Sequence, residues 1–255
     1  ANADIAVLDD DVRTDAAATN SNWTSTDLGG GSSYLVDLAD GDDSFTVNGT
    51  APSAAAQNLS HVNLGGGNDT LFAGTVPANF LAPGSHWVGG SGLDTLNFGS
   101  SASTGAAATY NFRGTTSTGD MVTGFEVFNL DQTGTETAQT VQLTLADLLE
   151  ITTGNAVARE LRIDGASVDV LQIGGLGVTG QTGGLAPLFS TPTAATTITD
   201  VDNVTTGNVV ASAAGDANAN DVTLGANVYD VYQFNTAAGT FTLLVDTDMT
   251  KTFIA

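Results

Sequence analysis

The feature that most constrains the fold is a segment rich in glycine and aspartate that recurs about every 25 residues. It reads VDLADGDDSF at residues 36–45, VNLGGGNDTL at residues 62–71 and WVGGSGLDTL at residues 87–96. Each copy has a short apolar strand, a glycine turn and a second short strand. A repeat of this length predicts that successive copies stack on one another and bury a shared apolar column. We therefore predict an all-β fold, a parallel β-solenoid with glycine-aspartate loops, followed by a β-rich C-terminal region that ends in a hairpin.

The alignment of the three copies identifies positions that would lie above one another. The aspartates Asp43, Asp69 and Asp94 are 26 and 25 residues apart. Apolar residues recur on both sides of the turn, and we expect them to form the inward ladder: Leu38, Phe45, Leu64, Leu71 and Leu96. A different local signal at residues 144–150 (TLADLLE), with Thr144 at the N-cap position and Asp147 three residues later, predicts one or two turns of capped helix.

The composition of the turns favours a hard cation. Glycines permit backbone conformations that direct carbonyl oxygens toward one point, and an aspartate adds a charged oxygen ligand. Ca²⁺ accepts six to eight oxygens with tolerant geometry, and stacked strands lie about 4.8 Å apart, so oxygens of two adjacent loops can share one ion. Our candidate ligands are the carboxylates of Asp43, Asp69 and Asp94, with Asp42 and Asn68 as auxiliary ligands and the carbonyls of Gly41, Gly67 and Gly92. The alternative is that these are glycine turns with solvated aspartates.

These residues carry a resemblance to a known family. Residues 89–97 (GGSGLDTLN) match every fixed position of G-G-x-G-x-D-x-U-x, the calcium-binding repeat of RTX proteins, and residues 64–72 (LGGGNDTLF) miss only the first glycine. Further along, VTGFEVFNL, VQLTLADLLEIT, LRIDG and the terminal YDVYQF and FTLLVDTDM follow in order. The chain thus resembles the C-terminal regions of RTX-type bacterial surface proteins exported by type I secretion, such as giant adhesins and S-layer proteins. The copies are wider apart than tandem nine-residue RTX repeats, which predicts one to three ions rather than a long row.

The resemblance implies an uncleaved secretion signal near the C-terminus, including residues 245–255, and folding after export, where external calcium is abundant. The first residues have neither an initiating Met nor a basic-then-apolar leader, so we expect a piece of a longer or processed protein without an N-terminal signal peptide. The expected location is extracellular, at the bacterial cell surface. The sequence contains no stretch of eighteen or more apolar residues, and it therefore predicts no transmembrane segment.

Charge restricts the partners. The 28 acidic residues against five basic ones give a formal net charge of −23, and such an excess repels itself in a compact state unless cations neutralise it. Five basic residues cannot form a phosphate-contacting stripe, so nucleic acid is excluded as a partner. The expected partners are other copies of the chain or other cell-surface components. The chain has no cysteine, and therefore neither disulfides nor thiolate metal sites.

A second candidate calcium segment is residues 216–221 (DANAND), in which Asp216, Asn218 and Asn220 place oxygens at alternate positions. It lacks the glycine and glutamate of an EF-hand loop, and an Asx-rich surface turn is the alternative. The chain's two histidines, His61 and His86, each follow a serine, but neighbours in sequence do not make a catalytic dyad. We expect both histidines to lie on strands near turns, and we predict that the chain is not an enzyme.

We place a soft domain boundary near residue 155. Residues 1–155 would form the calcium-loop domain, and residues 156–255 a β-rich region with the secretion signal. The function predicted from the sequence is a calcium-stabilised extracellular structural or adhesive protein that assembles into a layer or filament. Two alternatives stay open: a secreted carbohydrate-active or hydrolytic enzyme on a β-helix scaffold, and an export or anchoring module for upstream catalytic domains.

Overall fold

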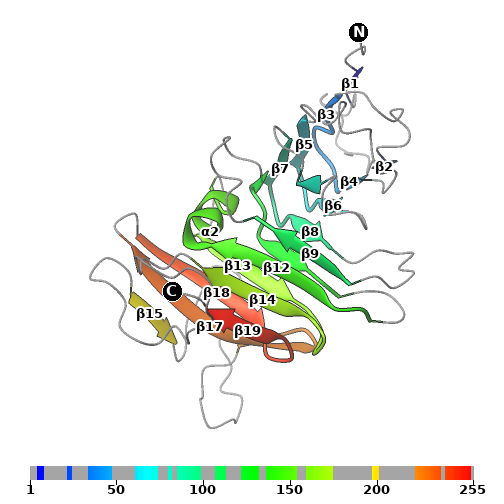
Figure 1. Ribbon diagram of the computed structural model, residues 1–255. Helices are drawn as coiled ribbons and strands as arrows, with labels where there is room; N and C mark the ends of the chain where they lie inside the picture. Colours follow the sequence, from blue (N-terminus) through cyan, green and yellow to red (C-terminus); the bar gives the residue numbers. More distant parts are fainter. Residues whose placement is uncertain are drawn as a thin grey trace.

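The structure is a computed structural model of the 255-residue chain. It describes residues 5–8, 22–24, 34–47, 61–73, 80–81, 85–98, 107–112, 122–131, 136–153, 159–174, 197–200, 222–236 and 239–253. Within these ranges the chain is mostly β, with three sheets and one seven-residue helix, α2 (Leu145–Ile151). Figure 1 shows β1 at one end of the molecule and the C-terminal strands β17, β18 and β19 toward the other.

Two of the three sheets are parallel throughout. The five-stranded sheet has the order β1 (Ile5–Leu8), β3 (Tyr34–Asp37), β5 (His61–Gly66), β7 (His86–Ser91) and β10 (Val122–Thr123). The four-stranded sheet has the order β19 (Thr250–Phe253), β14 (Val170–Gly174), β12 (Gln139–Thr144) and β9 (Ala108–Asn111).

The ten-stranded sheet is mixed. Its parallel part runs through β2 (Asn22–Thr24), β4 (Ser44–Thr46), β6 (Thr70–Phe72), β8 (Thr95–Asn97), β11 (Val127–Asn129), β13 (Glu160–Asp164) and β18 (Gly239–Asp246). Its antiparallel part adds β17 (Asn227–Thr236), β15 (Thr197–Asp200) and β16 (Val222–Leu224).

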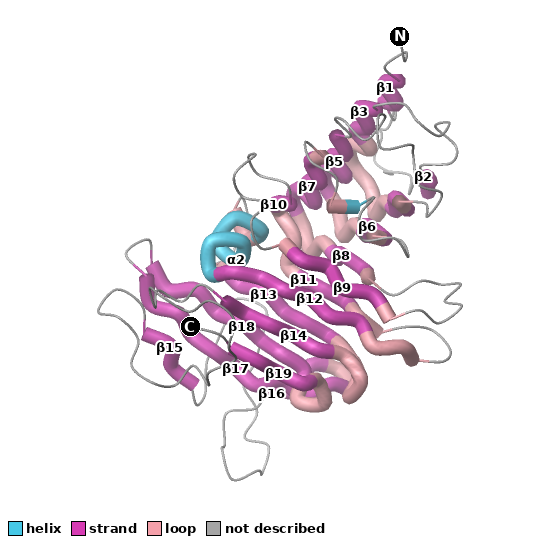
Figure 2. The backbone as a smooth tube through the Cα atoms, in the orientation of Figure 1, coloured by secondary structure: helices cyan, strands magenta, loops and turns pink. Residues whose placement is uncertain are grey.

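The predicted parallel β-solenoid is therefore wrong as a fold class. The described strands form several sheets, one of them mixed, and they do not close into a solenoid. The C-terminal hairpin that the sequence predicted is present, since β17 and β18 pair antiparallel. The physical reason for the mixed sheet is that β18 also pairs in parallel with β13, so the hairpin joins the sheet of the repeats. The chain also continues beyond this hairpin, because β19 follows it and pairs in parallel with β14. Figure 2 shows these strands together with the shorter strands nearer the N-terminus.

The repeats explain the parallel part. In each copy the first strand joins the five-stranded sheet and the second strand joins the ten-stranded sheet, as β5 and β6 do. Equivalent residues pair in register, for example Val62 with Trp87 and Leu71 with Leu96. The expected inward ladder is confirmed, since all five of its members are fully buried: Leu38, Phe45, Leu64, Leu71 and Leu96.

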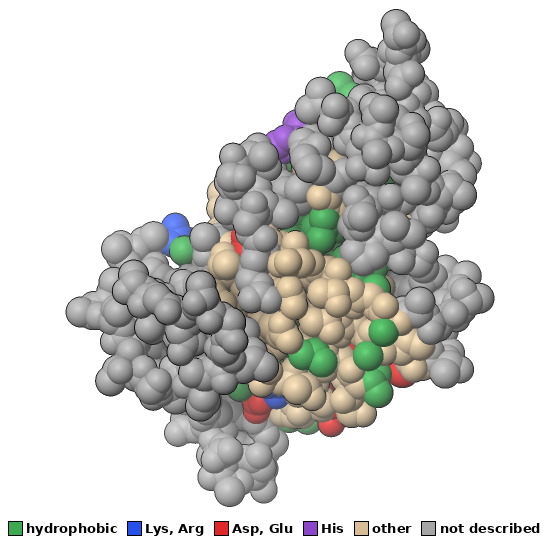
Figure 3. All heavy atoms as spheres, in the orientation of Figure 1, with side chains coloured by type: hydrophobic (Ala, Val, Ile, Leu, Met, Phe, Trp, Pro, Cys, Tyr) green, Lys and Arg blue, Asp and Glu red, His purple; other side chains and the backbone are tan. Residues whose placement is uncertain are grey.

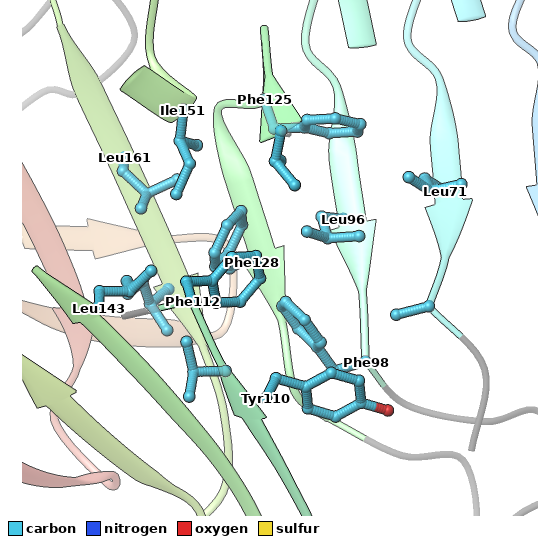
Figure 4. Close-up of a cluster of buried hydrophobic side chains, with 14 of the residues drawn as sticks. Leu71, Leu96, Phe98, Tyr110, Phe112, Phe125, Phe128, Leu143, Ile151 and Leu161 are labelled. Carbon is cyan, nitrogen blue, oxygen red and sulfur yellow. The ribbon is translucent and has the colours of Figure 1, made fainter. Parts of the chain in front are cut away.

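Aromatic side chains fill the middle of the core. The rings of Phe98 and Phe128 meet edge to face at 5.2 Å between centroids, and Tyr110 lies 4.6 Å from Phe98 (Figure 4). Near β7, the indole N–H of Trp87 donates to the carbonyl oxygen of Phe80 (3.0 Å), which satisfies the polar atom of this buried ring.

Helix α2 confirms the predicted capped helix. The hydroxyl of Thr144 accepts from the backbone N–H of Asp147 (3.2 Å), and the Asp147 carboxylate accepts from the backbone N–H of Thr144 (2.6 Å). This reciprocal pair is a capping box, which satisfies N–H groups that the helix itself leaves without partners. Across residue 155, β11 pairs with β13 and β12 with β14, and the domain boundary stays a prediction.

The outward face of the four-stranded sheet carries uncharged polar side chains. Gln142 of β12 donates from Nε2 to Oε1 of Gln172 on β14 (2.7 Å), and Figure 3 shows this side of the molecule largely in tan. No helix among the described residues is long and apolar enough to cross a membrane.

Candidate functional site

The loops that join the two strands of each repeat lie directly above one another. Gly65 pairs with Gly90 and Gly66 with Ser91 between β5 and β7, and a single parallel bridge joins Asp40 to Gly66. The copies are therefore in register through the turn as well as through the strands. This stacking places the three aspartates predicted as ligands, Asp43, Asp69 and Asp94, next to one another in successive copies.

Glycine is required in these loops because the backbone of one copy lies against that of the next. Gly67 has φ +143° and Gly92 has φ +140°, in a region that other residues rarely adopt. A Cβ on Gly67 would lie 1.8 Å from the carbonyl oxygen of Gly41, and a Cβ on Gly92 would lie 1.6 Å from that of Gly67. Of the predicted carbonyl ligands, those of Gly41 and Gly67 thus face the glycine of the following loop.

The aspartates form a ladder of backbone-to-carboxylate hydrogen bonds, which we call the carboxylate ladder. The backbone N–H of Asp43 donates to Oδ1 of Asp69 (2.7 Å), and that of Asp69 donates to Oδ1 of Asp94 (2.9 Å). The N–H of Asp94 in turn donates to Oε2 of Glu126 (2.7 Å). Each carboxylate therefore holds the loop of the preceding copy.

A second, exposed row runs beside it in the opposite sense. The backbone N–H of Asn68 donates to Oδ1 of Asp42 (2.8 Å), and that of Leu93 donates to Oδ1 of Asn68 (3.0 Å). Here the side chain holds the following copy. Asp42 and Asn68, the two residues predicted as auxiliary ligands, thus lie in the same loops, but their exposed side chains accept hydrogen bonds from backbone N–H groups of the following copy.

The carboxylate ladder is buried. The exposed fraction is 2% for Asp43, 1% for Asp69 and 0% for Asp94. Burial raises the pKa of Asp69 to about 7, and the neighbouring carboxylates of Asp94 and Asp43 add to this effect. Burial likewise raises the pKa of Asp94 to about 7, with a contribution from Glu126. Buried negative charges that lie next to one another destabilise each other, so the ladder favours a proton or a cation.

Two ladder oxygens lack hydrogen-bond partners within the described part of the chain. These are Oδ2 of Asp69 and Oδ2 of Asp94, both buried. The described ion pairs of Arg162 with Asp164 and of Lys251 with Asp230 engage other carboxylates. A buried, charged carboxylate oxygen without a donor is costly, so the charged form of these two side chains is disfavoured unless a proton or a cation compensates it.

Asp169 provides an internal comparison. It lies directly before β14, and its Oδ1 accepts from the backbone N–H of Gln139 (2.8 Å) as the ladder carboxylates do. Its second oxygen, however, accepts from the backbone N–H of Ala166 (2.9 Å). The chain itself therefore satisfies both oxygens of this buried carboxylate, whereas in Asp69 and Asp94 one oxygen is left over.

Sequence reasoning missed Glu126 as a member of the ladder. Val127 pairs with Thr95, so Glu126 occupies the position of Asp94 in the next copy. Burial raises the pKa of Glu126 to about 7. The signal was present in the segment GFEVFNL, but the spacing of 32 residues from Asp94 and the change from Asp to Glu disguised it.

The oxygens present are of the kind that calcium binds, because carboxylate and carbonyl oxygens suit hard cations. Among the described residues no three His, Cys, Asp or Glu side chains group together at metal-binding spacing, so a ligand set here would include backbone, amide or water oxygens. The second candidate segment, with Asp216, Asn218 and Asn220, lies outside the described residues.

The two histidines begin β5 and β7, on strands as expected. Their rings lie against each other with centroids 4.3 Å apart.

Comparisons with protein-family models, curated proteins and solved structures found no match to this chain.

Proposed function

We propose that this chain is a calcium-stabilised structural or adhesive module of a secreted bacterial surface protein. The observation that carries the proposal is the pair of buried oxygens, Oδ2 of Asp69 and Oδ2 of Asp94, that lack a donor within the described residues while Asp169 has both of its oxygens satisfied. A cation bound by these oxygens would relieve the burial cost and the mutual repulsion of the ladder.

The residues that would hold the ion are those of the stacked loops. Asp69 and Asp94 would supply charged oxygens, and the remaining ligands would come from backbone carbonyls, amide oxygens and water, because no third acidic side chain among the described residues groups with them at metal-binding spacing. Sites on extracellular modules bind calcium weakly, at concentrations that exist outside a cell but not inside it. Calcium would then couple folding to export, because binding to the native state alone stabilises it by mass action.

Charge supports the same function. A chain with a net charge of −23 repels itself and stays soluble until cations neutralise it. The partner that we propose is another copy of the chain or another surface component. This is supported by β1 and β2, which are the outermost strands of the five-stranded and ten-stranded sheets among the strands that the structure describes.

The test uses a substitution that keeps the ladder hydrogen bond and removes only the charge. Asn at position 69 or 94 can still accept through Oδ1. Without calcium at pH 8, Asp69→Asn and Asp94→Asn should therefore melt at or above the wild-type temperature, because a buried charge has been removed. With millimolar calcium they should melt below wild type, because the ligand has been lost. Circular dichroism with EDTA or with calcium measures both.

Asp169→Asn is the matched control. In this variant an NH₂ group replaces one of the two carboxylate oxygens, so either the N–H of Ala166 or the N–H of Gln139 loses its acceptor. The substitution should therefore lower the melting temperature equally with and without calcium. A wild-type protein whose melting temperature does not change with calcium would contradict the proposal. So would a calcium response that Asp69→Asn and Asp94→Asn leave intact. Light scattering on calcium addition then tests association between copies.

A further inference from the structure

The two histidines of the chain form a pair that the carboxylate ladder does not involve. His61 and His86 are the only histidines among 255 residues, and they are direct partners in the parallel register of β5 and β7. Their ring centroids are 4.3 Å apart and the ring planes are inclined by 51°. Nothing in the repeat requires histidine here, since the equivalent position on β3 is Leu35.

Both imidazoles lie on the outer face of the five-stranded sheet. The residues that follow them, Val62 and Trp87, are each 1% exposed and point into the core, so alternation turns the histidines outward. His61 is exposed and His86 is half-buried. Figure 3 shows the histidine side chains, in purple, at the molecular surface.

The separation of the rings suits a shared metal ion. A metal ion lies about 2.0–2.1 Å from an imidazole nitrogen, so the ring centres of two bound imidazoles are about 4.5 Å apart at a 90° angle and about 5.2 Å apart at a tetrahedral angle. The observed 4.3 Å is therefore closer to two neighbouring positions of a tetragonal copper site than to a tetrahedral zinc site. Each ring has two nitrogens and needs to offer only one. The net negative charge of the chain also raises the local concentration of cations.

We propose that His61 and His86 form a two-histidine chelate for a borderline divalent transition-metal ion such as Cu²⁺ or Zn²⁺, with water completing the coordination. Imidazole is a preferred ligand of these ions, whereas the oxygen-only ladder suits calcium. The two sites are separate, because His61 lies at the start of β5 and the loop that contains Asp69 follows its end, and the strand between them is about 17 Å long. The chain would thus bind a hard and a borderline cation at different places.

The experiment is carried out on the full chain saturated with calcium, so that the carboxylates are occupied. One equivalent of Cu²⁺ is added to wild type, His61→Gln and His86→Gln, and electron paramagnetic resonance counts the coupled imidazole nitrogens. Two nitrogens are expected in wild type and one in each variant. Titration calorimetry with Zn²⁺ should show an affinity lower by roughly tenfold or more in each single variant, because the second ligand of a chelate binds intramolecularly. The double variant should show no coupled imidazole nitrogen.

Circular dichroism checks that each variant keeps the wild-type fold; both substitutions affect outward-facing side chains. Three results would overturn the chelate: a copper spectrum without nitrogen coupling, single variants with wild-type zinc affinity, or single variants that each retain half of the binding sites. The last result would mean two independent imidazoles. Because the calcium response is measured separately with the Asp69→Asn variant, failure of the histidine site leaves the proposed function unaffected.

Discussion

At the scale of single residues, the aspartates of the repeat have a structural task that their motif does not reveal. Asp69 and Asp94 each use one oxygen to hold the backbone of the preceding loop. Only the second oxygen is available for another partner. Replacing the aspartate with alanine would therefore remove both the hydrogen bond and the oxygen that we propose to bind an ion, whereas asparagine keeps the first and removes the charge.

The raised pKa values predict an unusual pH dependence of the calcium-free protein. Asp69, Asp94 and Glu126 have ordinary pKa values near 4 and folded-state values of about 7, chiefly because of burial. Between these values the native state binds more protons than the unfolded state, so stability falls as pH rises. With EDTA, the melting temperature should decrease from about pH 4 to about pH 7 and level off above it. A melting temperature that rises across this interval would contradict the ladder's burial.

Close backbone contact makes a second prediction at this scale. In Gly92→Ala the new Cβ would meet the carbonyl oxygen of Gly67 at 1.6 Å, and strain and overpacking together should cost about 3 kcal/mol or more. Gly225→Ala is the control, since Gly225 also has positive φ (+63°) but no atom within 4 Å of its Cβ position, and it should cost about 1 kcal/mol. Urea denaturation of both variants measures the difference; equal costs would mean that the stacked backbones are not in contact.

The motif predicted which residues stack, and the calcium that it predicted at these residues stays a prediction. Asp43, Asp69 and Asp94 could be aligned because glycines mark the same turn in each copy. Glu126 was missed because its copy has a shorter loop and a longer spacing, and Asp169 because no glycine cluster precedes it. Such residues become equivalent only through strand register, which depends on contacts between distant parts of the chain.

At the scale of elements, local signals were sufficient where the interactions are local. The capping box of α2 involves residues three apart, and it was visible in the sequence. The pairing of β17 with β15 and β16 was not, because strand propensity does not specify direction or partner. The fold class failed at that point: repeats predicted parallel stacking, and the C-terminal strands added antiparallel pairs.

The cap of α2 can be tested directly. Thr144→Ala removes the hydroxyl that accepts from the N–H of Asp147 and should destabilise the protein by about 1 kcal/mol. Thr144→Ser keeps the hydroxyl and should cost clearly less. Chemical denaturation of the two variants gives the comparison, and equal losses would mean that the methyl group, rather than the cap, matters.

At the scale of the whole molecule, charge and site act together. General screening by salt weakens repulsion among exposed carboxylates, but it reaches buried ones less. The buried ladder should therefore respond to a bound ion rather than to ionic strength. This distinction separates a specific calcium site from an acidic protein that any salt would stabilise.

We expect millimolar CaCl₂ to raise the melting temperature more than NaCl or MgCl₂ at the same ionic strength. Magnesium serves as the matched divalent control, because it demands near-ideal octahedral geometry and loses water reluctantly. Thermal unfolding followed by circular dichroism in the three salts makes the measurement. Equal shifts in all three would attribute the stabilisation to screening alone.

The direction of the carboxylate ladder also bears on how such a chain could lengthen. Each of its carboxylates accepts from a backbone N–H of the preceding copy. Every copy therefore supplies a carboxylate acceptor to the copy before it and a backbone N–H donor to the copy after it. An in-frame duplication of one such unit would therefore leave every hydrogen bond of the carboxylate ladder matched. A repeat of this kind could gain or lose a copy without a new kind of contact in the ladder.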